Sequence, residues 1–204
     1  MKHVQWAAVV ALMVALGGCA GGTKISDSWK DTSMEPAPME KIVVVALTDD
    51  SVTKHMFEDR FAAALRARGN DAVASYTFVK AGSATNPDSL VAVLRAQGYT
   101  AALTARSLGE DMQETQTLGH AYYMPQGYYE WGSYYSMSYG AMMSTSYNER
   151  SGSVVVESNL FDLGSERLVW AARSSTTKTG KLREGIDSYT AAVVRDLARS
   201  RWIK

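Results

Sequence analysis

The chain has 204 residues, with 21 basic and 21 acidic side chains, so it carries no formal net charge at pH 7. A dedicated nucleic-acid-binding protein concentrates Lys and Arg on one face, and this balance therefore argues against nucleic acid as a partner. The chain has one cysteine, which excludes an intrachain disulfide framework. A domain of this length must be stabilised by its hydrophobic core instead.

Residues 1–18 have the pattern of a secretory signal peptide. The short positive stretch MKH is followed by an apolar run, WAAVVALMVAL, at residues 6–16. A helix that crosses a bilayer needs about 20 apolar residues, so this run is too short unless flanking residues contribute. An uncleaved anchor and an ordinary secretory signal are the alternatives. We expect the segment to direct export and then to be removed.

The signal ends in Leu16-Gly17-Gly18-Cys19, which resembles the lipobox of bacterial lipoproteins. In those proteins the cysteine receives a diacylglyceryl thioether and, after cleavage, its new amine is acylated, with chains such as palmitate. One acyl chain binds a membrane only marginally, whereas several on one residue anchor a protein stably. The resemblance implies that Cys19 is the lipid attachment site. By the Gram-negative sorting rules, Ala20 after the cysteine favours the outer membrane, facing the periplasm.

Residues 19–40 are rich in Gly, Ser, Asp, Lys and Pro and show no hydrophobic period. We expect a lipidated cysteine followed by a flexible tether, whose 21 residues would span about 25 Å as a coil. Trp29 is unusual in such a linker. We expect it to pack back against the domain.

Residues 41–204 predict a single α/β domain with a mixed sheet: βαβαβ, then an antiparallel hairpin and a C-terminal helix. Apolar, β-branched runs bounded by turn residues indicate strands, and apolar residues at four-residue spacing that end at a glycine indicate helices. The expected strands are 41–47, 71–76, 99–108, 153–161 and 167–176, and the expected helices are 52–68, 88–98 and 182–201. The order of the first five elements favours parallel strands with right-handed crossovers.

Several segments look like a group of uncharacterised bacterial lipoproteins classed as a domain of unknown function. The segments are SDSWKD at 26–31, KIVVV at 41–45, FED at 57–59, LRARG at 65–69, AVASY at 72–76 and LFDLGSERLVWAARSSTT at 160–177. The resemblance covers nearly the whole chain after the signal. It implies an envelope lipoprotein and brings no established catalytic residues.

Candidate catalytic groups are few. The sequence shows no zinc-ligand spacing, nucleophile elbow or phosphate-binding loop, so we expect no metal and no cofactor. The best candidate is Asp49-Asp50-Ser51, because open α/β sheets bind ligands beyond the carboxyl ends of their strands. The simpler interpretation is that Asp50 or Ser51 caps the helix that follows. We place Glu58 and Asp59 on a solvated helix face, and we interpret the basic end of the last helix as matching the helix dipole rather than binding lipid.

Residues 118–147 contain eight of the chain's eleven tyrosines and form the most unusual segment. No helical or alternating period is evident, and long loops inside compact domains are usually functional. One interpretation is a contact surface for an envelope protein, a sugar or a membrane, because Tyr and Trp offer large amphipathic faces. The other is a flap that completes the core; a third is self-association. The candidate contact residues are Tyr122, Tyr123, Tyr128, Tyr129, Trp131, Tyr134 and Tyr135.

Together these features predict a non-enzymatic, lipid-anchored envelope protein that acts as a binding or scaffold module. The first alternative is a structural or assembly lipoprotein that oligomerises through the aromatic segment. The second is an envelope enzyme that acts on glycan through the acidic residues after the first strand.

Overall fold

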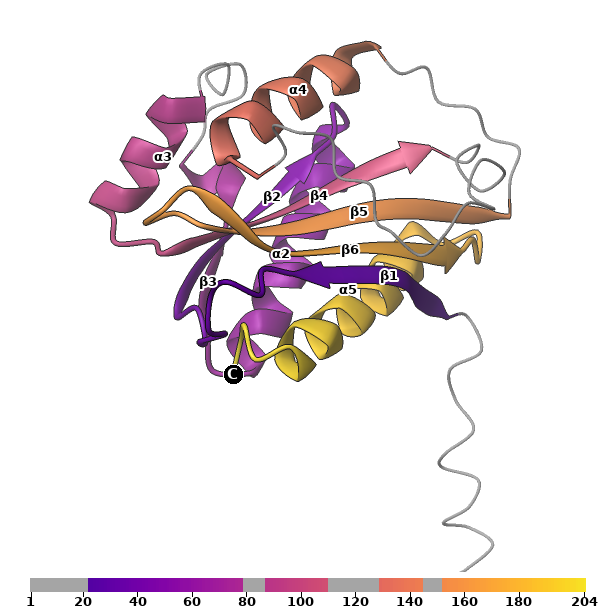
Figure 1. Cartoon of the computed structure of the whole chain (residues 1–204). Coiled ribbons are helices and arrows are strands. Elements are labelled where there is room, and N and C mark those ends of the chain that lie inside the picture. The colour runs from indigo at the N-terminus through magenta and orange to yellow at the C-terminus, as the bar shows by residue number, and fades with distance from the viewer. Residues whose placement is uncertain (1–21, 79–86, 110–128, 145–151) are drawn as a thin grey trace, which may run out of the picture.

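The computed structural model describes residues 22–78, 87–109, 129–144 and 152–204, which form a mixed sheet with helices on both faces (Figure 1). The α/β class and the order of elements predicted for residues 41–204 are confirmed. The strands are β1 Thr23–Lys30, β2 Lys41–Leu47, β3 Asp71–Ala74, β4 Ala101–Gly109, β5 Ser153–Asp162 and β6 Arg167–Thr177. The helices are α2 Ser51–Ala67, the short 3-10 helix η1 Ser75–Thr77, α3 Pro87–Ala96, α4 Trp131–Ser144 and α5 Leu182–Arg199.

The sheet has the order β1-β6-β5-β4-β2-β3. Strand β2 pairs in parallel with both β3 and β4, and the remaining neighbours are antiparallel. Because β3 and β4 lie on opposite sides of β2, right-handed crossovers place α2 and α3 on opposite faces of the sheet. This explains why residues 42–47 are all buried: β2 is covered on both faces.

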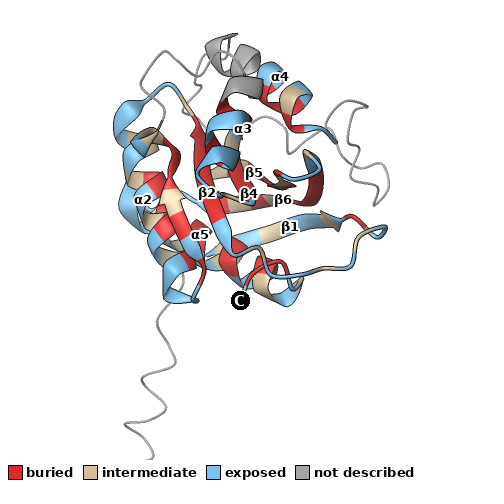
Figure 2. Cartoon of the chain, turned by 90° about the vertical axis from the view of Figure 1, so that its left-hand side faces the viewer, coloured by how far each residue is buried: buried red, intermediate tan, exposed pale blue. Residues whose placement is uncertain are grey.

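Each face of the sheet has its own hydrophobic core, and the outer surfaces of the helices are exposed (Figure 2). On one face, α2 and α5 bury Phe61, Leu65, Tyr189 and Leu197. On the other face, α3 and α4 cover the sheet with the residues Leu90, Val91, Leu94, Trp131, Tyr134 and Tyr135. Within the described ranges, no helix combines the length and apolar character needed to span a membrane.

Strand β1 corrects one expectation. Residues 19–40 were predicted to be a flexible tether, but Thr23–Lys30 pairs antiparallel with β6 as an edge strand. Thr23 and Ile25 are partly buried and alternate with exposed neighbours, as in a half-buried strand; three exposed residues, 26–28, then precede the partly buried Trp29. The register shifts between Ile25 and Asp27, so Ile25 packs against the α2/α5 core and Trp29 against the α3/α4 core. The predicted packing of Trp29 on the domain is confirmed.

Helix α4 corrects a second expectation, because we found no helical period in residues 118–147. Trp131, Tyr134, Tyr135 and Ser138 are buried and have the spacing of one helix face. The pattern is hidden because Met137, on the exposed side of the helix, is also apolar. Tyr and Gly, which are poor helix formers, further weaken the signal.

Candidate functional site

The carboxyl ends of β2 and β4 are the place where an open α/β sheet would bind a ligand. Asp49 and Asp50 follow β2 there, and the segment 110–128 that follows β4 lies outside the described residues. Asp50 is the N-cap of α2. Its carboxylate accepts hydrogen bonds from the Val52 N–H at 3.0 Å, from the Thr53 N–H at 3.3 Å and from the Thr53 hydroxyl. The capping interpretation is therefore confirmed for Asp50.

The hydrogen bonds also set the charge state of Asp50. The Thr53 hydroxyl and the Val52 N–H favour the ionised carboxylate and hold the pKa of Asp50 below its ordinary value. A carboxylate of this kind stabilises the positive end of the helix. It is a poor general base, because both of its oxygens already accept hydrogen bonds.

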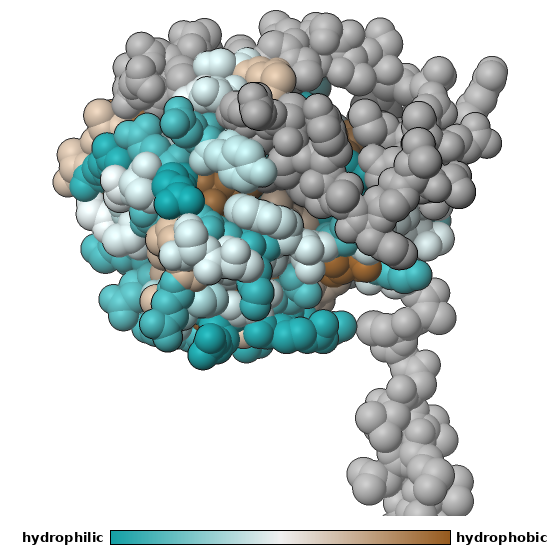
Figure 3. All heavy atoms as spheres, in the orientation of Figure 1, coloured by the Kyte–Doolittle hydropathy of each residue, from teal (hydrophilic) through white to brown (hydrophobic). Residues whose placement is uncertain are grey.

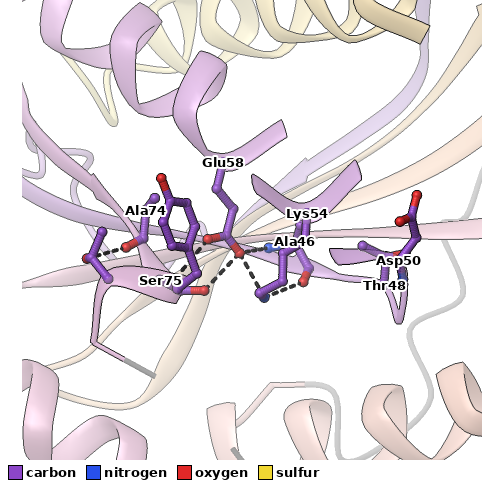
Figure 4. Close-up of polar contacts among 9 residues, drawn as sticks. Ala46, Thr48, Asp50, Lys54, Glu58, Ala74 and Ser75 are labelled. Carbon is purple, nitrogen blue, oxygen red and sulfur yellow. Dashed lines mark hydrogen bonds and ion pairs between the residues drawn. The ribbon is translucent and has the colours of Figure 1, made fainter. Parts of the chain in front are cut away.

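Glu58 forms the most completely bonded polar centre near these strand ends (Figure 4). Its Oε1 accepts the Ala46 N–H at 2.8 Å and the Ser75 hydroxyl at 2.8 Å, and its Oε2 accepts the Tyr76 N–H at 3.1 Å. The Lys54 ammonium lies 2.9 Å from Oε1 and also donates to the Ala46 carbonyl at 2.9 Å. One carboxylate thus joins β2, α2 and η1.

The prediction that Glu58 lies on a solvated helix face is wrong, because Glu58 is 0% exposed. The sequence contains a signal for this burial: Phe61, Ala62 and Leu65 follow Glu58 at three-, four- and seven-residue spacing, which places all four on one face of α2. A buried carboxylate is stable only when its oxygens are paired, and here they are. We therefore assign Glu58 to a structural junction between the elements.

Asp59 is exposed, as predicted, and it contacts the same junction from outside. Its carboxylate accepts the Tyr76 hydroxyl at 2.6 Å, and this hydrogen bond raises the pKa of Tyr76. The ring of Tyr76 lies against His55, with the two ring centroids 4.1 Å apart. These contacts hold the turn after β3 against α2.

A second polar group lies on the α4 face of the sheet and was not predicted. Glu157 on β5 lies opposite Arg106 on β4 and Arg173 on β6. The Arg106 guanidinium is 3.6 Å from the Glu157 carboxylate, which also accepts the Asn159 amide at 2.9 Å. Burial and the negative charge of Glu157 raise the pKa of Tyr134 on α4 well above its ordinary value. This ionic row crosses three strands under the aromatic helix.

The predicted aromatic contact residues divide into three groups. Trp131 and Tyr134 are 0% exposed and Tyr135 is 4% exposed; the Trp131 ring stacks on Tyr135 with centroids 5.3 Å apart and meets Phe161 edge-on. The contact-surface interpretation is therefore wrong for these three residues, which complete the core. Tyr129 is exposed, and its ring packs edge-on against Trp29 at 5.9 Å. The remaining candidates, Tyr122, Tyr123 and Tyr128, and the lipid site Cys19 lie outside the described residues.

No family model matches the chain, and no curated protein matches it. The solved structures that it matches include a PelC dodecamer from Paraburkholderia phytofirmans, with 16% sequence identity and a TM-score of 0.45 over 89% of this chain and 99% of that one. They also include a dodecamer of a Leu-to-Met variant of PelC from the same organism, with 17% identity and a TM-score of 0.46 over 87% of this chain and 98% of that one.

The described part of the chain holds no group of three or more His, Cys, Asp or Glu side chains that could bind a metal ion. The two acidic centres near the parallel strand ends have structural partners: Asp50 caps α2, and Glu58 joins β2 to η1. Asp49 is exposed and lies beside the cap. Among the described residues at this end of the sheet, Asp50 and Glu58 therefore have structural roles.

Proposed function

We propose that this chain is a non-catalytic, lipid-anchored protein of the bacterial cell envelope that works by contact beside the membrane. The observation that carries the proposal is the spacing between Cys19 and β1. The strand begins at Thr23, four residues after the cysteine of the lipobox-like motif. Four residues reach at most about 14 Å when fully extended, so acyl chains on Cys19 would hold the sheet edge itself at the bilayer surface.

The hydrogen bonds of Asp50 and Glu58 support the non-catalytic part of the proposal. A general acid or base must be able to exchange a proton with a substrate. Glu58 is buried among its four partners, and Asp50 is engaged by the first turn of α2. An enzyme that uses these carboxylates would have to break the contacts that hold its own strands and helix together.

The test of anchoring is the variant Cys19→Ser, expressed in cells supplied with a labelled palmitate analogue. We expect the wild-type chain to be labelled and membrane-bound, and the variant to be unlabelled and recovered in the soluble envelope fraction. A matched control is the double variant Cys19→Ser/Ser28→Cys, which restores a thiol at an exposed position of β1 outside the motif. Labelling of this control, or retention of Cys19→Ser in the membrane, contradicts the proposal.

We also propose that the anchor lies in the outer membrane and faces the periplasm, on the basis of Ala20 after the lipidated cysteine. The variant Ala20→Asp tests the sorting step. Density-gradient separation of the two membranes should move the variant to the inner membrane while labelling at Cys19 persists. An unchanged distribution contradicts this location.

A second candidate function is a self-associating subunit of an envelope assembly. The observation that favours it is the surface beside and along α4, where Tyr129 and Met137 are each 44% exposed although both are large and apolar. Both edges of the sheet disfavour strand pairing, because β1 carries Lys24, Asp27 and Lys30, and β3 has only four residues. PelC is a dodecamer in both structures described above. For this chain, self-association is proposed from its own side-chain surface.

Native mass spectrometry of the acylated protein in detergent tests the second candidate. We expect an oligomer for the wild-type chain and a monomer for Tyr129→Ser/Met137→Ser. Val52→Ser is the matched control, since Val52 is an exposed apolar residue on α2, which covers the other face of the sheet. A wild-type monomer at micromolar concentration contradicts self-association and leaves the anchoring proposal intact.

A further inference from the structure

Basic side chains gather at the end of the molecule where the described chain begins. Residues 22–25 and 177–184 contain four basic residues and one acidic residue, Glu184, in a chain that is neutral overall. Leu182, at the start of α5, is 51% exposed among them. The residues Lys24, Lys178, Lys181, Leu182 and Arg183 are called the anchor-side patch.

Direct hydrogen bonds bring the parts of the patch together. The Thr23 N–H donates to the Ser188 hydroxyl at 2.9 Å, and the hydroxyls of Thr23 and Thr176 lie 2.8 Å apart. Lys24 pairs with Ser175 in the β1–β6 register. The start of β1, the end of β6 and the first turns of α5 therefore meet at one place, and Figure 1 shows α5 running away from it towards the C-terminus.

The distance to the lipid attachment site is limited by the covalent chain. Cys19 precedes Thr23 by four residues, which span at most about 14 Å. Charges interact appreciably over a Debye length of about 8 Å at physiological salt. A domain anchored through Cys19 must therefore hold the anchor-side patch within one or two Debye lengths of the headgroups.

The C-terminal end of α5 is far from the anchor-side patch. Arg199 lies 17 residues after Leu182 on the helix, which corresponds to about 26 Å. The residues beyond it have partners within the domain: the Trp202 carbonyl accepts the Met39 N–H at 2.8 Å, and the Lys204 carbonyl accepts the Arg68 guanidinium at 2.8 Å. The basic end of α5 singled out by the sequence thus lies away from the anchor.

We propose that the anchor-side patch binds the phosphate groups of an anionic phospholipid surface, with Leu182 among the headgroups, and so sets the orientation of the domain on the membrane. The inference rests on the proposed lipid anchor at Cys19. Lys ammonium groups bind phosphate as point charges, and an exposed leucine beside them adds apolar contact with the interface. Glu184 lies 2.8 Å from Lys181 and offsets its positive charge. Figure 3 shows hydrophilic surface along the lower edge of the molecule and a hydrophobic patch close to where the described chain begins.

The test uses the acylated protein and a single fluorescent label. Because Cys19 is the only cysteine and its thiol is consumed by acylation, a cysteine introduced elsewhere is the only free thiol. Thr179→Cys places the label in the exposed turn before α5 and leaves the anchor-side patch intact, whereas Arg199→Cys places it at the far end of the helix. Each protein is incorporated into vesicles of phosphatidylglycerol and phosphatidylethanolamine that carry a nitroxide on the headgroup.

We expect strong quenching of the label at position 179 and little quenching at position 199. Lys181→Glu/Arg183→Glu should weaken the quenching at 179 several-fold, because the anchor still keeps the label near the membrane but the patch no longer binds phosphate, while the matched pair Arg195→Glu/Arg199→Glu should preserve it. Circular dichroism checks that each variant folds. High salt, or phosphatidylcholine in place of phosphatidylglycerol, should reduce the quenching because the attraction is electrostatic.

The outcomes separate the two proposals. Vesicle-bound protein with equal quenching at both positions, or with quenching at 179 that Lys181→Glu/Arg183→Glu does not weaken, overturns the inference and leaves the anchor intact. Protein that lacks acyl chains and stays off the vesicles overturns the anchor, and the inference with it.

Discussion

The carboxylate of Glu58 and the ammonium group of Lys54 lie 2.9 Å apart on successive turns of α2, yet Glu58 is fully buried while the Lys54 side chain is 26% exposed. The ammonium can therefore reach water if the pair is broken. The groups buried around the carboxylate cannot, since the N–H of Ala46 and the hydroxyl of Ser75 point at Glu58 from two other elements. The stability of this junction depends on the carboxylate.

Glu58→Ala should lower the free energy of unfolding by about 3 kcal/mol or more, because each buried donor left without an acceptor costs about 1–3 kcal/mol. Glu58→Gln should cost less, since its amide oxygen still accepts hydrogen bonds. Urea unfolding measures both. Glu35→Gln, at an exposed position, is the control and should change stability by less than about 0.5 kcal/mol. A Glu58→Ala variant as stable as the control contradicts the assignment of a structural junction.

Asp50→Ala should lower Tm at pH 7, and Asp49→Ala should not, because only Asp50 caps α2. The pKa of Asp50 is lowered in the folded state, so its contribution is fully present above the ordinary value of 3.8 and is lost as pH falls through the lower folded value. Calorimetry should therefore show the difference between wild type and Asp50→Ala shrinking below about pH 4. A difference that grows on acidification contradicts the sign of this shift.

Asparagine variants at the same two positions test the glycan-enzyme alternative. We expect the purified wild-type chain, Asp49→Asn and Asp50→Asn all to turn over peptidoglycan fragments no faster than a buffer control does. Turnover by the wild-type chain that disappears in Asp49→Asn would restore the enzyme hypothesis, because this side chain is exposed at the end of β2 and is not the cap.

Trp131→Ala should cost about 3–5 kcal/mol of unfolding free energy, as expected for an aromatic residue removed from a core. Tyr129→Ala removes an aromatic side chain two residues earlier that is 44% exposed, so it should cost much less. Chemical unfolding of the two variants compares them directly. Similar small losses for both would restore the interpretation of Trp131 as part of a contact surface.

A chain that begins at residue 41 should unfold at lower temperature than one that begins at residue 22, and it should aggregate. Without β1 the edge of β6 is uncovered, and the partly buried side chains of Ile25 and Trp29 are lost from the two cores. Differential scanning calorimetry and light scattering provide the measurement. Equal Tm values for the two chains would mean that residues 23–30 are the tether suggested by their composition.

A strand with a continuous apolar run is easier to predict than one whose apolar residues are interrupted by polar ones. Lys41–Leu47 was predicted with its observed bounds because a continuous β-branched run between polar residues has one structural interpretation. Strand β1 was missed because its three inward-facing residues are separated by charged and polar ones, and because its register shift breaks the alternation. Local composition cannot reveal a strand whose burial depends on pairing with residues 170–176.

At the candidate site, contacts between residues close in the chain could likewise be predicted, and contacts between distant residues could not. The capping role of Asp50 could be predicted because a cap bonds to the residues that directly follow it. The helical spacing of Glu58 signals its burial, but its hydrogen-bond partners Ala46 and Ser75 are 12 and 17 residues away in the chain, so the junction itself could not be predicted. Likewise, the row of Arg106, Glu157 and Arg173 exists only because three strands are placed in register.

The most direct test of the account is the intact mass of the protein purified from native membranes, with fragmentation of its N-terminal peptide. The account predicts a chain that begins at Cys19 and carries a diacylglyceryl group on sulfur and an acyl chain on its amine. A chain that retains residues 1–18, or an unmodified thiol at Cys19, would contradict it.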